Sequence, residues 1–136
     1  MRCLLLTLVL LTTGPVGAGP NESKILGEWQ LIEFEGKPAS THMKKTRWRF
    51  ETNHKFIWYG PGKKYEGTFH LLPNRKPRAL RLDLSGEPHG GSARAAFRII
   101  KNRLLIKLND SGGQKVPRDF KPQNGHDLYL FERVKP

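Results

Sequence analysis

The sequence predicts an all-β fold, a single antiparallel up-and-down barrel of about eight strands. Short runs of alternating apolar and polar residues follow one another along the chain, and turns rich in glycine, proline and asparagine separate them. The pattern contains no long helical segment and no internal repeat. A meander of this kind in one small domain favours a closed barrel over a sandwich, because closure removes exposed strand edges.

The two ends of the predicted domain carry residues that suit the closed end of a barrel. Gly27-Glu28-Trp29 opens the first strand, and Arg133 lies in the last strand. The glycine permits a tight backbone bend, and the Trp29 indole is expected to plug the barrel beneath the Arg133 guanidinium. We therefore expect Gly27, Trp29 and Arg133 to close the floor of the barrel.

The first half of the domain contains four predicted strands. Glycine and proline mark turns at residues 35–38 and 60–62, and residues 39–45 are expected to form a loop or a short helical turn. Gly67 stands among large residues, which indicates a bend or a close approach of two backbones. The four strands are expected at residues 29–34, 47–51, 55–59 and 64–72.

The second half contains four more strands. Leu80, Leu82 and Leu84 alternate with Arg81 and Asp83, the clearest pattern of a half-buried strand in the chain. Residues 73–77 form a basic loop before it, residues 86–91 a turn after it, and residues 109–127 a looser connection. The remaining strands are expected at residues 93–100, 104–108 and 128–134.

Residues 1–18 have the layout of a cleaved secretory signal. Met1-Arg2 supplies a positive start, residues 4–11 are apolar apart from Thr7, and small residues precede the expected cleavage after Ala18. The apolar run is far shorter than the ~20 residues that cross a bilayer, so no membrane span is expected. We expect an exported protein, periplasmic or secreted, with a single domain over residues 19–136.

Cleavage would remove Cys3 and leave a mature chain of 118 residues without cysteine. An exported domain without disulfides depends on its core alone, which suits a bacterial exported protein. Arg2 leaves with the signal, so 23 basic residues face 12 acidic ones, a formal charge of +11. Such a surface attracts polyanions, although charge spread along a whole chain also serves solubility alone.

Several short segments occur in an order and spacing that resemble a known family. They are residues 26–29, 35–37, 47–50, 65–69, 77–82, 99–105, 116–120 and 128–133. This series is similar to the uncharacterised lipocalin-like domain abundant in exported planctomycete proteins, and it covers residues 24–133. The resemblance implies a small lipocalin-like barrel with no assigned activity and no catalytic residues. The chain departs from the family at residues 104–108, where relatives often carry a cysteine-containing segment.

Aromatic residues at expected inward or rim positions are the candidates for a ligand pocket. Barrels of about eight strands either hold one small apolar molecule or are filled by their own side chains. Both readings fit these residues, and the choice between pocket and core stays open at this point. The candidates are Trp48, Phe50, Phe56, Trp58, Tyr65, Phe69 and Phe97.

Basic residues gather on two neighbouring parts of the predicted sheet. One loop and strand carry Arg75, Lys76, Arg78 and Arg81, and the next hairpin carries Arg94, Arg98, Lys101, Arg103 and Lys107. Alternation directs Arg94 and Arg98 outward, so the hairpin should carry a basic outer stripe. A functional stripe would bind polyanions with a steep salt dependence. The alternative is an ordinary solvated face.

Catalysis has little support in the sequence. The five histidines lack the spacing of metal ligands, and neither a nucleophile elbow nor a phosphate-binding glycine loop is present. We expect no enzyme activity, no metal and no cofactor, and no specific nucleic acid as partner. The expected function is binding of a small apolar ligand or an envelope component. The alternatives are a basic adaptor for acidic cell-surface polymers and a structural or partner-docking module.

Overall fold

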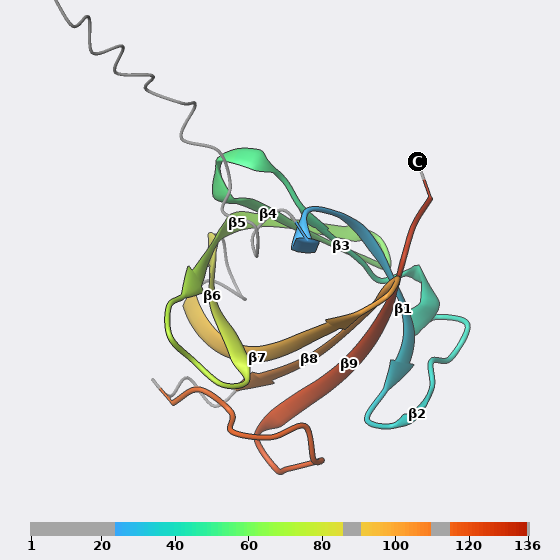
Figure 1. The fold of residues 1–136 in the computed structure, drawn as a ribbon. Coiled ribbons are helices and arrows are strands. Elements are labelled where there is room, and N and C mark those ends of the chain that lie inside the picture. The colour runs from blue at the N-terminus through green and yellow to red at the C-terminus, as the bar shows by residue number, and fades with distance from the viewer. Residues whose placement is uncertain (1–23, 86–90, 110–114, 136) are drawn as a thin grey trace, which may run out of the picture.

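A computed structural model describes residues 24–85, 91–109 and 115–135 and shows a closed antiparallel β-barrel (Figure 1). A two-residue strand, β2 (Lys37–Pro38), extends the edge of β1, and the turns η1 (Met43–Lys45) and η2 (Thr52–His54) are 3₁₀. In this part of the chain eight strands form the wall: β1 (Gly27–Phe34), β3 (Arg47–Phe50), β4 (Lys55–Gly60), β5 (Lys63–Leu72), β6 (Arg78–Ser85), β7 (Gly91–Ile100), β8 (Arg103–Asn109) and β9 (His126–Arg133).

Hydrogen bonds close the wall in sequence order. Each of these strands pairs antiparallel with the next, and β9 returns to pair with β1. Trp29 is thereby placed opposite Trp48 of β3 on one side and Arg133 of β9 on the other. The prediction of an all-β, up-and-down barrel of about eight strands is confirmed, and the sheet has no free long edge because it closes on itself.

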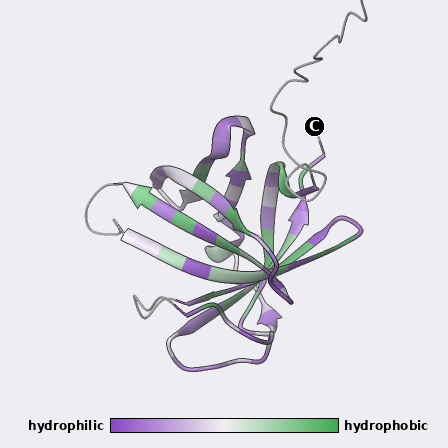
Figure 2. Cartoon of the chain, turned by 60° about the vertical axis from the view of Figure 1, so that its left-hand side comes forward, coloured by the Kyte–Doolittle hydropathy of each residue, from purple (hydrophilic) through white to green (hydrophobic). Residues whose placement is uncertain are grey.

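The strands alternate between a buried face and a polar face, as the sequence pattern predicts (Figure 2). On β3, Trp48 and Phe50 are buried while Arg47 and Arg49 are exposed. On β6, Leu80 and Leu82 are buried inside the barrel. The core consists of the inward-facing side chains of all eight strands together with Ile25 and Ala39. Side chains thus fill much of the barrel interior.

Several connections are better defined in the structure than in the sequence. The short helical turn expected within residues 39–45 is η1, and Glu35 and Gly36 make the expected turn after β1. Within the looser connection, side chains of residues 115–125 contact the outer face of β7 and β8. The predicted turn at residues 86–91 lies outside the described residues except for Gly91, which begins β7. The predicted signal sequence also lies outside them.

Gly67 on β5 allows a close approach of two backbones, as the sequence predicted. A Cβ atom at this position would lie 1.9 Å from the backbone oxygen of Asp83 on β6. Gly67 is paired with Leu84, beside Asp83, so the contact lies near one end of the β5–β6 ladder. Only a residue without a side chain fits here.

The floor of the barrel joins the first and last strands. The Arg133 guanidinium carbon lies 4.2 Å from the centroid of the Trp29 ring, which is fully buried. Arg133 also donates hydrogen bonds to the carbonyl oxygens of Leu26, at 2.7 Å, and Lys24, at 2.6 Å. A Cβ on Gly27, where φ is +119°, would lie 3.0 Å from Nη1 of Arg133. The three residues expected at the floor therefore meet there.

Replacing the floor indole should strongly destabilise the fold. We expect Trp29→Ala to lower the free energy of unfolding by about 3–5 kcal/mol, because the deletion leaves a cavity in a packed core. Chemical denaturation followed by circular dichroism measures this change. A loss below about 1 kcal/mol would contradict the role of Trp29, since buried aromatic deletions cost more than that.

The backbone contact at Gly67 gives a second prediction. Gly67→Ala should lower the free energy of unfolding by about 1–3 kcal/mol, because the added methyl group forces β5 and β6 apart. Gly62→Ala is a useful comparison, since nothing lies within 4 Å of a Cβ at Gly62 and only its positive φ opposes the change. Equal stability of the Gly67→Ala protein and the wild type would contradict the close approach.

Candidate functional site

The barrel interior is built around the indole of Trp48. Its ring centroid lies 4.7 Å from that of Phe131, 5.1 Å from those of Trp58 and Tyr129, and 5.4 Å from that of Phe56. The rings are tilted or edge-on to one another, the arrangement that aromatic quadrupoles favour. Strands β3, β4 and β9 supply these side chains. Since β1 lies between β3 and β9, the aromatic cluster joins the strands on both sides of β1.

The seven predicted pocket residues all lie at inward positions, but with different exposure. Trp58 and Tyr65 are half-buried and are direct cross-strand neighbours on β4 and β5. The ring of Phe69 packs 5.1 Å from that of Phe50, which connects β5 to the cluster. The five buried members are Trp48, Phe50, Phe56, Phe69 and Phe97. These five belong to the packed core, and the two half-buried residues mark where the interior meets the surface.

Sequence reasoning did not select three further aromatic residues of this cluster. Tyr129 and Phe131 alternate inward along β9, and Phe34 packs 5.2 Å from Tyr129. The Tyr129 hydroxyl lies 3.4 Å from Oδ2 of Asp127 at the same end of the barrel. The alternation of residues 127–131 in the last strand carried the signal that would have identified Tyr129 and Phe131.

The barrel contains two fully buried indoles, and they differ in whether the indole N–H forms a hydrogen bond. Nε1 of Trp29 donates to the carbonyl oxygen of Ile25 at 2.8 Å. Nε1 of Trp48 is buried and has no hydrogen-bond partner among the residues that the structure describes. Leaving a buried donor unpaired costs about 1–3 kcal/mol, and such groups are rare in native proteins. The Trp48 donor is therefore the chemically unusual group of the interior.

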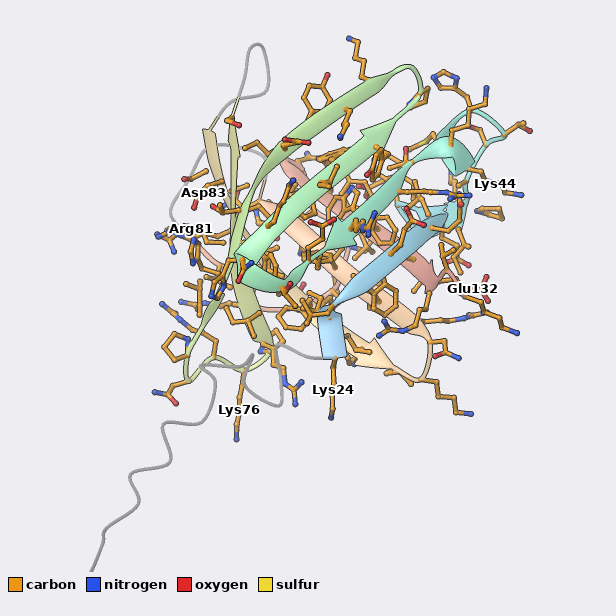
Figure 3. The ribbon with its side chains drawn as sticks, turned by 90° about the horizontal axis from the view of Figure 1, so that it is seen from above. Lys24, Lys44, Lys76, Arg81, Asp83 and Glu132 are labelled. Atoms are coloured by element: carbon orange, nitrogen blue, oxygen red, sulfur yellow. The ribbon has the colours of Figure 1, made fainter. Side chains whose placement is uncertain are left out.

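The predicted basic residues divide between separate parts of the outer surface. Arg81 of β6 and Arg94 of β7 are direct cross-strand neighbours. Arg75, Lys76 and Arg78 are exposed near the β5–β6 connection, and Lys101 and Arg103 are exposed at the β7–β8 turn. Figure 3 shows Lys76 projecting at the same end of the barrel as Lys24, away from Arg81. The structure thus brings together Arg81 and Arg94 but not the whole predicted set.

A strap formed by residues 115–125 covers the outer face of β7 and β8. Lys107 faces outward on β8 but is only 1% exposed beneath this strap. Its ammonium group donates to Oδ1 of Asp119 and Oε1 of Gln123, both at 3.1 Å. The guanidinium carbon of Arg98, exposed as predicted, lies 5.0 Å from the Phe120 ring centroid. Two members of the predicted basic hairpin therefore fasten the strap.

The pKa of the Asp119 carboxyl lies below its ordinary value. The largest cause is the hydrogen bond from the backbone N–H of Lys121, followed by the hydrogen bond from Lys107. A depressed folded-state pKa adds stability above the unfolded-state pKa, and that stability is lost as the pH falls. The strap is thus held most firmly when Asp119 is ionised.

In residues 24–85, 91–109 and 115–135, no group of three or more histidine, cysteine, aspartate or glutamate side chains is arranged to hold a metal ion. Within the same ranges, no helix has the length and apolar character needed to cross a bilayer.

Comparisons of the whole chain with protein families, curated proteins and solved structures find no match.

The strap yields a prediction about pH. We expect Asp119→Asn to lower the midpoint of thermal unfolding at neutral pH, because Lys107 then keeps its buried charge without a carboxylate partner. The difference from wild type should shrink as the pH falls below about 4, the ordinary range of an aspartate. Thermal scans between neutral and acidic pH measure both effects.

A matched control is the ion pair of Lys64 and Glu66, whose side chains are 53% and 48% exposed. Glu66→Gln should change the unfolding midpoint much less, because solvent screens an exposed pair. Equal effects of the two substitutions at neutral pH would show that the buried ammonium of Lys107 has no special dependence on Asp119.

Proposed function

We propose that the protein is an exported, lipocalin-like binding protein whose barrel takes up a small, largely apolar molecule with one hydrogen-bond acceptor. The observation that carries this proposal is the buried indole N–H of Trp48, which has no hydrogen-bond partner within residues 24–85, 91–109 and 115–135. An acceptor such as a carbonyl, hydroxyl or carboxylate oxygen would complete it. The aromatic lining would contact the rest of the molecule.

An indole adds a hydrogen-bond donor at this position. Phenylalanine would fill an aromatic core without bringing a donor that needs a partner. Four rings have centroids within 5.4 Å of the Trp48 ring centroid: those of Phe56, Trp58, Tyr129 and Phe131. Among these four side chains only Tyr129 carries an oxygen, and that hydroxyl lies 3.4 Å from Oδ2 of Asp127. A buried donor in such surroundings contributes favourably to ligand binding when the ligand supplies a hydrogen-bond acceptor. The unfavourable unpaired state then belongs to the ligand-free protein.

The route into the barrel is expected at the end of the barrel where β4 turns into β5. Trp58 and Tyr65 are the two half-buried members of the aromatic set, and they are cross-strand neighbours. The Trp58 ring packs directly on Trp48, with a centroid distance of 5.1 Å. Rotation of these two side chains would open a path to the Trp48 donor without breaking the β4–β5 ladder. A ligand would take the space that the two rings leave.

The expected export signal and the resemblance to the exported lipocalin-like domain support the same function. A signal over residues 1–18 would place the barrel among envelope components and small molecules outside the cytoplasm. The resemblance implies a small lipocalin-like barrel without an assigned activity, so it adds no catalytic role. Binding rather than catalysis is therefore the proposed activity.

Two matched probes test the role of the Trp48 donor. Naphthalene and 2-acetonaphthone have the same aromatic body, but only the second carries a carbonyl acceptor. We expect the wild type to bind 2-acetonaphthone about 5- to 150-fold more tightly, the range that pairing one buried donor covers. NMR titrations at high salt, monitored through the indole N–H resonance of Trp48, measure the ratio of the two affinities.

The substitution Trp48→Phe should abolish that preference and leave naphthalene binding within a few-fold. Trp58→Phe is the matched control, because it removes an indole at the rim and keeps the Trp48 donor. Failure of both probes to bind, or a preference that persists in Trp48→Phe, would overturn the proposal. Persistence at high salt separates this function from an electrostatic adaptor, whose partner is released as salt rises.

A further inference from the structure

Several connections of the barrel meet at its closed end, where Trp29 and Arg133 form the floor. In an up-and-down barrel, every second connection lies at the same end. The β3–β4 turn, the β5–β6 connection and the β7–β8 turn therefore share the floor end. Hydrogen bonds from Arg133 to the carbonyl oxygens of Asn102 and Lys24 place the β7–β8 turn and the segment leading into β1 there as well.

Exposed basic side chains gather on these connections. They come from the segment that leads into β1, from the β5–β6 connection and the start of β6, and from the β7–β8 turn and the start of β8. Figure 3 shows Lys24 and Lys76 pointing away from the barrel at this end, whereas Lys44 lies at the opposite end. We call the set the basic floor; its members are Lys24, Arg75, Lys76, Arg78, Lys101 and Arg103.

The basic floor keeps an excess of positive charge. Within the part of the chain that the structure describes, no ion pair joins any of its six side chains to a carboxylate. Two glutamates at this end bear on the balance. Glu51 already pairs with Arg49, at 3.1 Å, and Glu132 is the direct cross-strand neighbour of Arg103. These two carboxylates are too few to neutralise six cations, so the end attracts anionic surfaces.

An aliphatic side chain is exposed among these cations. Ile100 ends β7 immediately before Lys101 and is the direct partner of Arg103 across the β7–β8 hairpin. Its side chain is 57% exposed, and no other large apolar side chain of the described residues is exposed to this degree. A single exposed isoleucine is ordinary on a protein surface. Here it lies between two cations, so charge and apolar area are presented together.

The turn beside Ile100 holds a lysine in a conformation that suits glycine. Lys101 has a φ of 55°, in the left-handed region that side chains with a Cβ adopt at a cost. Asn102, the next residue of the turn, is of a type that enters this region more readily than lysine does. Backbone strain of this kind is found most often at functional positions. A positive charge is therefore retained at the tip of the turn against the local backbone preference.

We propose that the basic floor and Ile100 bind the barrel to an anionic lipid surface. The cations lie over lipid phosphate groups, which arginine and lysine side chains bind through charge-assisted hydrogen bonds. The Ile100 side chain enters the boundary between the headgroups and the acyl chains, as apolar side chains of interfacial proteins do. An acidic polysaccharide or a nucleic acid would contact the same cations, but it offers an isoleucine no apolar layer to enter.

Binding through the floor leaves the opposite end of the barrel facing away from the lipid. The proposed route to the interior lies at that opposite end, where β4 turns into β5. Protein bound to lipid in this orientation therefore keeps the entrance of its interior open. Trp48→Phe should leave lipid binding unchanged, because Trp48 is fully buried in the core. The lipid proposal thus stands or fails separately from the interior ligand.

Vesicles of phosphatidylglycerol and phosphatidylcholine in equal amounts are the test surface, and vesicles of phosphatidylcholine alone are the neutral reference. Co-sedimentation at about 0.1 M salt should show binding to the anionic vesicles at least about tenfold tighter than to the neutral ones. Higher salt should weaken the binding, because salt screens the attraction between charges. Equal binding to both kinds of vesicle would overturn the proposal.

Two double variants test whether the charges act at this end of the barrel. Lys101→Gln with Arg103→Gln should weaken binding to the anionic vesicles about 10- to 25-fold, because each basic residue near an anionic surface strengthens binding by up to about fivefold. Lys44→Gln with Lys45→Gln is the matched control, since both lysines are exposed in η1 at the opposite end.

The control variant should change the affinity less than about twofold. Strands of about eight residues rise about 3.3 Å per residue and tilt by about 40°, so the two ends are roughly 20 Å apart. That separation is about twice the screening length of ~10 Å at 0.1 M salt. Equal losses of affinity in the two double variants would reduce the effect to net charge and overturn the proposal.

Two substitutions of Ile100 separate a lipid surface from a soluble polyanion. Ile100→Ser should weaken binding to the anionic vesicles about 3- to 10-fold, because the exposed part of the side chain no longer enters the apolar boundary. Ile100→Trp should bind at least as tightly as the wild type, since tryptophan favours the membrane interface. The emission of the added indole should shift to shorter wavelengths on binding. Circular dichroism confirms that each variant is folded.

Unchanged binding of the Ile100→Ser protein, together with no emission shift in the Ile100→Trp protein, would overturn the proposal, because the partner would then contact the cations alone. Tighter binding of a heparin hexasaccharide or of single-stranded DNA than of the anionic vesicles would also overturn it. Either result would assign the basic floor to a soluble polyanion in place of a lipid surface.

Discussion

The barrel depends on the contact between the Arg133 guanidinium and the Trp29 indole. This contact joins the last strand to the first, and the same guanidinium binds the carbonyl oxygens of Lys24 and Leu26. The entry of the chain into β1 is thereby fixed to its exit from β9. Gly27 is needed because a side chain there would crowd the guanidinium. Closure at this seam gives both the packed interior and the continuous outer wall.

Closure places the interior and the surface under different physical rules. Inside, aromatic rings pack closely. A buried polar atom without a hydrogen-bond partner destabilises the fold there, because apolar neighbours cannot replace the hydrogen bond that it makes with water. Trp29 meets this requirement through Ile25, whereas Trp48 does not. The two indoles have the same burial but different chemistry. The first indole is part of the closed floor of the barrel, and the proposed binding function rests on the second.

The outer wall is shaped by one glycine and by one strap. Gly67 lets β5 and β6 approach, and a shallow groove of the surface includes this position. On the next strands, the strap buries Lys107 and converts a basic outward position into a structural one. The basic side chains of this surface therefore do not all have the same role.

The sequence by itself determined the barrel, most of its strands and the Gly27–Trp29–Arg133 floor, because period-two alternation and turn residues are local signals. Tertiary structure alone decided which polar groups lack or gain a partner. The isolation of the Trp48 donor depends on rings from β4 and β9, and the stacking of His54 on His70 depends on a turn reaching over another strand. Such contacts join residues distant in the chain, and alternation specifies only the face on which each residue lies.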